Sequence, residues 1–558
     1  MSAIATAPLP LGPPDSRADQ VKVAMRDGAG LATDVYLPAG RGPFPAILTR
    51  LPYDKCGRDC FIPWVAAYVT ERGYAFVAQD TRGKGRSEGE TIAFVNEVAD
   101  GYDSLEWLAG RPWCDGAIAM WGESYFGLTQ WAAAASGHPA LRAIVPRNTS
   151  PDIAGDWLSR QGVPRFAFPL AWAADTWMDG RMYGIVSADL DWSGGTATSA
   201  LASVHGERTC ASVELWQANP VAGPLGERLP FSPARLAAGL SIPALHLGGW
   251  FDIFRRGQMA AWRAARRGSP VPQLLMMDAT DHAHARWSSE PVGPIDLHAI
   301  PDAEIEAFMP AYLDSTLAFY DAVLRGRAHA GAPVRWRAAG GEWRSEASWP
   351  PAGAEPLRFG LVDARGADAG GDGGGLSSRP DPVPSQIAWE HDPTQPVPSL
   401  YVDELQALAA PPDDRVLDGR TDLLRFTSEP FAAGLRIAGP VLARIATTAA
   451  SARAETTAKL VDVAPDGSTR RLADGAAAHG PDTRWRPLAI DLGDLAHDLV
   501  PGHRLRLEIA ASSYPQLLPR PWGESWGSGT EAVERTLVVG GPNGSALELT
   551  VLPVGSGG

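Results

Sequence analysis

Two kinds of hydrophobic pattern alternate along the first third of the chain. Residues 21–37, VKVAMRDGAGLATDVYL, alternate apolar and polar positions across an Asp-Gly pair, which predicts an antiparallel hairpin. Continuous apolar runs follow at 44–50, 74–80 and 117–121, whereas residues 95–111 have the period of a helix. Apolar runs that alternate with helical segments predict a parallel sheet with helices on both faces.

The same pattern resumes only after a long interruption. Residues 242–249 and 272–279 predict two further buried strands, and a helix is expected near 303–325. The interruption, residues 151–235, has weak strand signals, so we expect a mostly helical cap over the carboxyl edge of the sheet. Its aromatic residues are numerous: Trp157, Phe166, Phe168, Trp172, Trp177, Tyr183 and Trp192.

After Gly326 the sequence pattern changes to short apolar runs between clusters of Pro, Gly and Asp, which predicts a β-sandwich. The runs VLARIATTA, TTAKLVDVAPDGSTRRL, HRLRLEIAAS, RTLVVGG and ALELTVLPV are the expected strands. The predicted fold class is therefore α/β: a doubly wound sheet with a helical cap and a C-terminal β domain. The expected domains are 17–150 with 236–326 for the sheet, 151–235 for the cap and 327–556 for the sandwich.

The length, the net charge and the lack of long apolar runs argue against some classes of protein. A chain of 558 residues is too long for one core, and its net charge of −15 argues against a nucleic-acid partner. No apolar run reaches the roughly 18 residues of a membrane span. The first 20 residues have no basic region and several prolines, so we expect a disordered leader, not a signal peptide. A cytoplasmic location follows as an expectation; the oligomeric state is not predicted.

The four cysteines (Cys56, Cys60, Cys114 and Cys210) are too few for a disulfide framework in a chain of this length. Cys56 and Cys60 could bind a metal in principle, but no second Cys pair completes a zinc site. We therefore interpret all four as reduced structural thiols, and we expect no metal and no cofactor.

The letters Trp-Gly-Glu-Ser occur twice, and each copy offers a candidate nucleophile. Ser525, in WGESWG, fits the G-x-S-x-G pattern of a serine-hydrolase elbow to the letter, but Pro precedes it and a Gly-Ser string follows. Ser124 has Phe126 at the third position and a glycine one place later, yet a buried strand precedes it and a good helix follows. Because an elbow needs a strand, a sharp turn and a helix, the sequence favours Ser124.

A nucleophilic serine needs a base and a carboxylate that orients the base. In doubly wound hydrolases these residues follow the serine in the order Asp, His, each after a later strand. Asp252 comes just past strand 242–249, and His282 and His284 come just past strand 272–279. The sequence therefore contains a candidate Ser-Asp-His set in the expected order.

The chain resembles the cocaine esterase and X-Pro dipeptidyl-peptidase family of α/β hydrolases over nearly its whole length. RPWCDGAIAMWGESYFG resembles the family's elbow, in which the displaced glycine is normal. The other matching segments are LPYDK, DTRGKGRSEG, GGWFDIF, FYDAVLRG, WRSEASWP, DPTQPVP, RTDLLRFTSEP, and, in the C-terminal jelly roll, KLVDVAPDGS and PGHRLRLEIAASSYP. The resemblance implies an α/β-hydrolase sheet with a helical cap and a jelly-roll domain.

The resemblance also implies roles for individual residues. Ser124 would be the nucleophile, Asp252 the orienting carboxylate and a histidine of 282–284 the base. Tyr53, in LPYDK, would donate its hydroxyl to the oxyanion beside the backbone N–H of Tyr125. Asp54 and Arg82, in neighbouring matched segments, are interpreted as residues that brace loops.

One segment departs from the family pattern. The family's histidine usually closes G-P-W-[ST]-H, whereas this chain has MDATDHAH. The register of the base therefore stays open between two residues, and counting from the end of the strand favours His282 over His284.

Two other function classes remain open at this point. His-x-His on an extended segment could bind a metal, although a serine elbow would then have no purpose. The chain could also be a non-catalytic binding protein with a hydrolase fold, which the complete Ser-Asp-His order argues against. The jelly roll shows no site of its own and is expected to brace the catalytic domain.

The sequence says less about the substrate. The aromatic cap, with Trp157 and Phe254 as expected contacts by family analogy, favours an apolar or aromatic acyl group on a small ester. Amide cleavage is the second possibility. An exopeptidase would need carboxylates that bind a free amine, and the cap offers Asp152, Asp156, Asp175 and Asp179.

Overall fold

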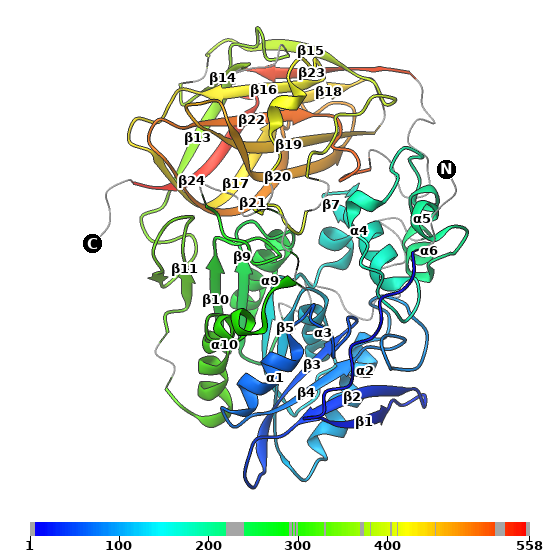
Figure 1. Cartoon of the computed structure of the whole chain (residues 1–558). Helices are drawn as coiled ribbons and strands as arrows, with labels where there is room; N and C mark the ends of the chain where they lie inside the picture. Colours follow the sequence, from blue (N-terminus) through cyan, green and yellow to red (C-terminus); the bar gives the residue numbers. More distant parts are fainter. Residues whose placement is uncertain are drawn as a thin grey trace.

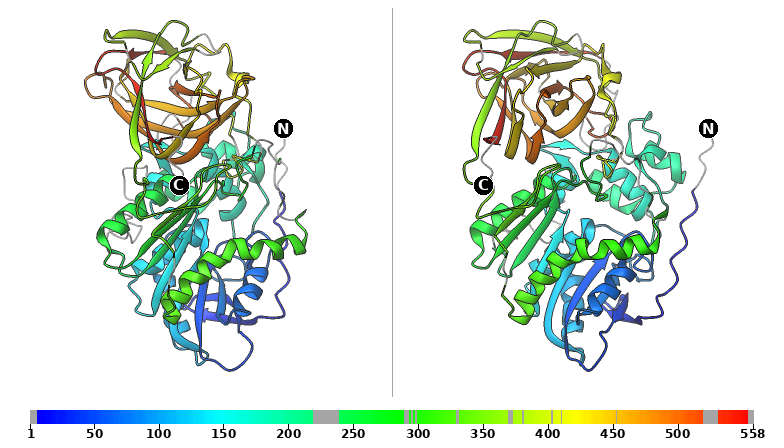
Figure 2. Two further views of the ribbon diagram at one scale, coloured as in Figure 1. Left: turned by 90° about the vertical axis from the view of Figure 1, so that its left-hand side faces the viewer. Right: turned by 60° about the vertical axis from the view of Figure 1, so that its left-hand side comes forward.

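A computed structural model describes most of the chain (Figure 1). The described residues are 6–218, 239–288, 293, 296, 299–328, 331–368, 373–379, 381–401, 404–409, 411–451, 453–518 and 531–553. The cap is inserted between β6 and β9 of a mixed α/β domain, and an all-β domain follows. The β domain lies over the cap and the edge of the sheet (Figures 1 and 2).

A ten-stranded sheet forms the α/β domain, in the order β1-β2-β4-β3-β5-β6-β9-β10-β11-β12. The seven central strands, from β4 through β3, β5, β6, β9 and β10 to β11 in sheet order, run parallel, while β1, β2 and β12 pair antiparallel with their neighbours. In sheet order the strands are Asp19–Ala24, Gly30–Tyr36, Ala75–Asp80, Phe44–Leu51, Cys114–Glu123, Leu141–Arg147, Ala244–Gly249, Gln273–Asp278, Val334–Trp336 and Arg344–Glu346. Because β11 and β12 belong to this sheet, it continues past residue 326, where we expected the domain to end.

Helices cover both faces of the sheet, as the apolar strand pattern predicts. In β5, Ile118 and Met120 enter one hydrophobic cluster, and Ala119 and Trp121 enter another on the opposite face. The first cluster includes residues of α2, α3 and α9, and the second includes residues of α1 and α10. These helices are α1 (Ile62–Thr70), α2 (Glu97–Ala109), α3 (Ser124–Ala135), α9 (Arg255–Gly268) and α10 (Asp302–Arg325).

Short helical turns predominate in the described part of the cap. They are η1 (Ile153–Trp157), α4 (Ala167–Trp172), η2 (Ala173–Trp177), η3 (Ser187–Asp189), α5 (Ala197–His205) and α6 (Ala211–Ala218), with a small hairpin of β7 (Ser159–Arg160) and β8 (Val163–Pro164). The cap aromatics form its core: Trp157, Trp177 and Trp216 are each 1% exposed. Aromatic burial therefore compensates for the short helices.

The C-terminal domain contains a nine-stranded sheet, β20-β19-β22-β16-β14-β13-β24-β17-β21, and a three-stranded sheet, β15-β23-β18. The expected β-rich domain is confirmed. Its elements are β13 (Glu355–Val362), β14 (Gly374–Ser377), β15 (Ser385–His391), η5 (Asp414–Leu417), β16 (Leu423–Ser428), β17 (Leu435–Ile445), β18 (Thr447–Ala449), β19 (Ala454–Val463), β20 (Thr469–His479), β21 (Leu488–Leu499), β22 (Arg504–Ala510), β23 (Val533–Val539) and β24 (Ala546–Leu552).

The leader is not disordered over residues 6–18, so that prediction is wrong for this segment. Thr6 and Leu9 donate backbone hydrogen bonds to the cap, at 3.3 Å to Val204 and 2.7 Å to Met182. The N–H of Gly12 donates to the carboxylate of Asp54 at 2.5 Å, next to Tyr53. Prolines keep the segment extended, and the residues between them supply the donors that hold it in place.

Candidate active site

Ser124 lies at a sharp turn between β5 and α3. Its φ of +51° is in the left-handed region, which is rare for a residue with a side chain and typical of strained functional turns. A Cβ at Gly122 would lie 2.1 Å from Phe126, and one at Gly127 would lie 2.6 Å from Thr149. The tight turn therefore requires glycine at 122 and 127, which explains the displaced glycine of the motif. The second candidate, Ser525, lies outside the described residues.

Asp252 and His282 come together at the carboxyl end of the sheet. Strands β9 and β10 end in register, with Gly249 opposite Asp278, so the loops that follow them leave side by side. His282 Nδ1 and Asp252 Oδ2 are 2.6 Å apart, and Asp252 Oδ1 accepts from the N–H of Phe254 at 2.7 Å. Burial favours the neutral ring of His282, but the Asp252 carboxylate outweighs burial and raises the pKa of the imidazole.

His284 binds a different carboxylate. Its Nε2 lies 3.0 Å from Glu123 Oε2, and its φ is +63°. Although burial raises the pKa of Glu123, the electrostatic interaction and hydrogen bond with His284 outweigh it and lower that pKa to about 2. The two imidazoles thus pair with separate carboxylates and do not converge on one point. Within the described ranges, no group of three His, Cys, Asp or Glu side chains could hold a metal ion.

The turn of Ser124 and the base loop lie close together. Glu123, the residue before Ser124, interacts electrostatically with His282 as well as with His284. On the other side, the ring of Phe254 lies 5.7 Å from that of His282. The structure therefore brings Ser124, Asp252 and His282 to one region at the carboxyl edge of the sheet.

Tyr53 reaches the same region from the loop after β3. Its phenol interacts with the side chains of Ser124 and Trp172, and its ring packs edge-on against Phe126 at 6.2 Å. Burial raises the pKa of this phenol well above its usual value. Tyr53 is therefore protonated at neutral pH and can donate a hydrogen bond next to Ser124.

Tyr125 is held by a buried network that the sequence did not reveal. Its hydroxyl donates to Glu97 at 2.9 Å and accepts from the N–H of Phe94 at 2.7 Å. Glu97 in turn forms an ion pair with Arg50 at 2.9 Å. This network fixes the first turn of α3, where the backbone N–H of Tyr125 lies. In the sequence, Glu97 lies in a segment with helical periodicity, and that periodicity does not indicate that its side chain holds Tyr125.

Trp157 and Phe254, the expected substrate contacts, pack on each other at a ring distance of 4.1 Å. They are 1% and 0% exposed, and Trp157 Nε1 donates to the carbonyl of Ser150 at 2.8 Å. Both rings lie near the candidate site, because Phe254 contacts His282 and Trp157 contacts Tyr125. In this structure both rings are buried next to the candidate site.

The cap carboxylates are already engaged. Asp175 accepts three backbone N–H groups of residues 183–185, at 2.7 to 3.3 Å. Asp179 pairs with Arg208, Asp156 pairs with Arg160, and Asp152 accepts from the N–H of Gly155. Each of these four side chains therefore makes at least one bond within the cap, although Asp156 Oδ2 is buried and has no hydrogen-bond partner among the described residues.

Asp54 and Arg82 brace loops around the site. Asp54 accepts from the N–H of Cys56 at 3.0 Å, in addition to its bond with the N-terminal segment. Arg82 forms ion pairs with Asp27 at 2.8 Å and with Asp100 at 2.7 Å. The four cysteines have free thiols.

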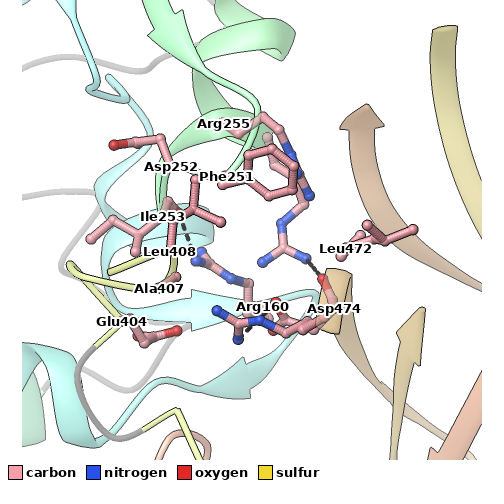
Figure 3. Close-up of a pocket in the computed structure, with 13 residues that line it drawn as sticks. Arg160, Phe251, Asp252, Ile253, Arg255, Glu404, Ala407, Leu408, Leu472 and Asp474 are labelled. Carbon is pink, nitrogen blue, oxygen red and sulfur yellow. Dashed lines mark hydrogen bonds and ion pairs between the residues drawn. The ribbon is translucent and has the colours of Figure 1, made fainter. Parts of the chain in front are cut away.

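A cavity of about 40 Å³ lies behind the turn that carries Asp252, between the cap and the β domain. Arg160, Arg255 and Arg256 line it together with Asp474 (Figure 3). Arg160 Nη2 donates to the carbonyl of Ile253 at 2.8 Å, while the Asp252 carboxylate points away from Arg160 (Figure 3). Arg160 therefore supports the back of the turn, and the Asp252 carboxylate contacts His282 on the other side.

Comparison with known proteins places the chain in a family. A sequence profile described as X-Pro dipeptidyl-peptidase (S15 family) matches residues 27–284, and one for the X-Pro dipeptidyl-peptidase C-terminal non-catalytic domain matches residues 328–546. The chain is 32% identical over 551 residues to cocaine esterase from Rhodococcus sp. strain MB1 Bresler, covering 90% of this chain and 92% of that protein. The chain belongs to this family. It is a serine hydrolase that acts on ester or amide bonds.

Solved structures share the fold of nearly the whole chain, the α/β-hydrolase domain and the C-terminal β domain together. An aminopeptidase from the marine sediment archaeon Thaumarchaeota archaeon has a TM-score of 0.77 at 22% identity, covering 98% of this chain and 99% of its own. An α-amino acid ester hydrolase has a TM-score of 0.76 at 22% identity, covering 97% of this chain and 98% of its own. Within the described ranges, no helix of this family member is both long and apolar enough to cross a bilayer.

Proposed function

We propose that this hydrolase cleaves small carboxylic esters through an acyl-enzyme formed on Ser124. The observation that carries the proposal is the 2.6 Å contact between His282 Nδ1 and Asp252 Oδ2 beside the strained turn of Ser124. With Nδ1 engaged by the carboxylate, the other ring nitrogen of His282 is free to accept the serine proton. His282 is therefore the general base, and His284 is not.

The reaction proceeds in two halves. Ser124 Oγ attacks the acyl carbon as its proton moves to His282, and the tetrahedral intermediate then expels the alcohol, which takes that proton. Water, deprotonated by His282, attacks the acyl-enzyme. The second tetrahedral intermediate then releases the carboxylic acid and expels Ser124 Oγ, which takes the proton back from His282. Asp252 stabilises the imidazolium in both halves. The hydroxyl of Tyr53 and the N–H of Tyr125 donate to the oxyanion.

A small apolar or aromatic acyl group fits this site best. Aromatic side chains such as Trp157, Trp172 and Phe254 surround the proposed triad. The similarity to cocaine esterase favours an ester as substrate. Cleavage of amides is the second possibility, since the same triad can perform it. Xaa-Pro dipeptide release is disfavoured because the cap carboxylates are engaged in structural bonds.

Replacing Tyr53 with Phe is expected to lower kcat by about 10²- to 10³-fold with little change in KM, because its hydroxyl acts on charge that develops in the transition state. Steady-state kinetics on p-nitrophenyl esters measure the effect. Tyr68→Phe, on the surface of α1, is the matched control and should match the wild type. An unchanged kcat in Tyr53→Phe would require another oxyanion donor.

The pH dependence of kcat/KM should report the ionisation of His282. The ring must be neutral to accept the proton, so activity should rise with pH through one ionisation. Because Asp252 raises the pKa of His282, the midpoint should lie above the ordinary histidine value of about 6.5. A pH–rate profile from about pH 5 to about pH 9 measures this midpoint. A profile without any ionisation in this range would contradict His282 as the base.

A substrate panel tests the proposed specificity. Purified protein should hydrolyse p-nitrophenyl and aryl esters faster than acyl anilides, and Xaa-Pro anilides slowest. Cleavage of Xaa-Pro anilides with a higher kcat/KM than all esters would show that the protein is an exopeptidase.

A further inference from the structure

A second cavity, of about 340 Å³, lies between α10 and the carboxyl ends of β6, β9 and β10. Ser124, Asp252 and His282 are not among the residues that line it. Its lining comes from five parts of the sequence: the end of β6, the end of β9, β10 with the loop after it, α10, and β11 with the loop after it. The long helix α10 runs along the sheet on this side (Figure 2).

The walls of this cavity carry an excess of positive charge. Four guanidinium groups, those of Arg147, Arg286, Arg335 and Arg337, line it, against one acidic residue, Asp278. Asp278 is already bound by Arg337 at 2.5 and 2.8 Å and by Arg286 at 3.2 Å. In the part of the chain that the structure describes, Arg147 and Arg335 have no carboxylate within 4.0 Å.

The two arginines without carboxylates are held by other groups. Arg147 donates from Nη2 to the carbonyl of Tyr312 at 2.6 Å, and Arg335 lies over the ring of Trp343 at 5.3 Å. These contacts orient both side chains. Glu123 interacts electrostatically with Arg147, but among the described residues no carboxylate forms an ion pair with either arginine. Two oriented guanidinium groups without an ion-paired carboxylate at one cavity are an arrangement that recognises an oxyanion.

Unpartnered polar atoms lie at the same place. Among the described residues, Arg147 Nε is buried and has no hydrogen-bond partner. Asn148 is 2% exposed, and its amide oxygen is likewise buried without a partner in this part of the chain. The amide of an asparagine can be turned to present either its oxygen or its NH₂ group. Because buried polar groups are normally hydrogen-bonded, these groups on the cavity wall are available to bond a molecule that enters it.

The remainder of the lining is apolar. Leu247 and Met276 come from the sheet, Phe308 comes from α10, and the indole of Trp343 adds an aromatic wall. A cavity of this volume has room for more than an inorganic ion. We propose that it binds a small organic anion, a carboxylate or phosphate carried on an apolar body.

Isothermal titration calorimetry on the full-length chain tests this proposal. Benzoate and phenyl phosphate are the probes, and benzyl alcohol is the neutral counterpart. We expect saturable one-to-one binding of at least one anion and none of the alcohol. The anion that binds more tightly identifies the oxyanion that the cavity prefers. Binding should weaken with added salt, as expected for a charge-assisted contact.

Substitutions locate the ligand. Arg335→Gln and Arg147→Gln should each weaken binding by about tenfold or more, because each removes a charge-assisted contact. Arg335→Lys keeps the charge but not the planar fork, so its affinity should be intermediate. The matched control is Arg344→Gln: this arginine lies on the neighbouring strand over Trp336, outside the cavity lining. Its affinity should equal that of the wild type.

Three results would overturn the proposal: no saturable binding of either anion, binding that survives both glutamine substitutions, or loss of binding when a fluorophosphonate blocks the catalytic serine. The last result would place the anion in the catalytic cleft. Thermal unfolding of each variant confirms that it is folded, and Arg335→Gln is the safer variant because Arg335 is only half-buried. Since calorimetry needs no turnover, the outcome is independent of the proposed triad.

Discussion

Ser124→Ala should lose essentially all hydrolysis, with kcat reduced by about 10⁴- to 10⁶-fold, while the protein stays folded. The serine hydroxyl has no packing role that alanine cannot fill, and alanine keeps a Cβ at the strained turn. The rate of p-nitrophenyl ester hydrolysis and the thermal unfolding midpoint measure the two expectations.

Ser525→Ala is the matched control for this variant, because Ser525 follows the same three residues, Trp-Gly-Glu. We expect its kcat to be close to that of the wild type. An inactive Ser525→Ala together with an active Ser124→Ala would mean that the second copy of the motif holds the nucleophile.

The two histidines of the base loop should differ sharply. His282→Ala is expected to lower kcat by several orders of magnitude, roughly 10⁴-fold or more, and Asp252→Asn by a similar factor. His284→Ala should stay within about tenfold of the wild type, since its partner is Glu123 and not Asp252. Burst release of p-nitrophenol measures acylation directly in each variant.

The result that would contradict this assignment is the reverse pattern, with acylation lost in His284→Ala and retained in His282→Ala. Activity retained in both variants would remove the Ser-His-Asp mechanism altogether. Neither result would affect the family membership, which depends on the similarity of the whole chain.

Much of the candidate site at the carboxyl edge of the sheet could be predicted, because it depends on patterns in short stretches of sequence. Strand ends are visible as apolar runs, and parallel strands place the loops that follow them at one edge, so Asp252 and His282 were expected near each other. The elbow around Ser124 is likewise a local strand–turn–helix signal. Which carboxylate each histidine contacts depends on the directions in which the two side chains point. Counting residues from the end of a strand suggests these directions but does not determine them.

Features that depend on long-range contacts could not be predicted. Residues 6–18 look disordered in sequence because prolines preclude a helix, and their partners, Asp54, Met182 and Val204, lie far along the chain. Strands β11 and β12 have three residues each, too few for a periodic signal. Arg147 and Arg335 meet at one cavity although almost two hundred residues separate them.

The central claim is that Ser124 carries the acyl group, and labelling tests it most directly. The purified protein is treated with a fluorophosphonate, digested, and mapped by mass spectrometry. We expect a single stoichiometric adduct on the peptide that contains Ser124, formed in parallel with loss of esterase activity, and none in Ser124→Ala. An adduct on Ser525 or another residue, or full inactivation without an adduct on Ser124, would contradict the account.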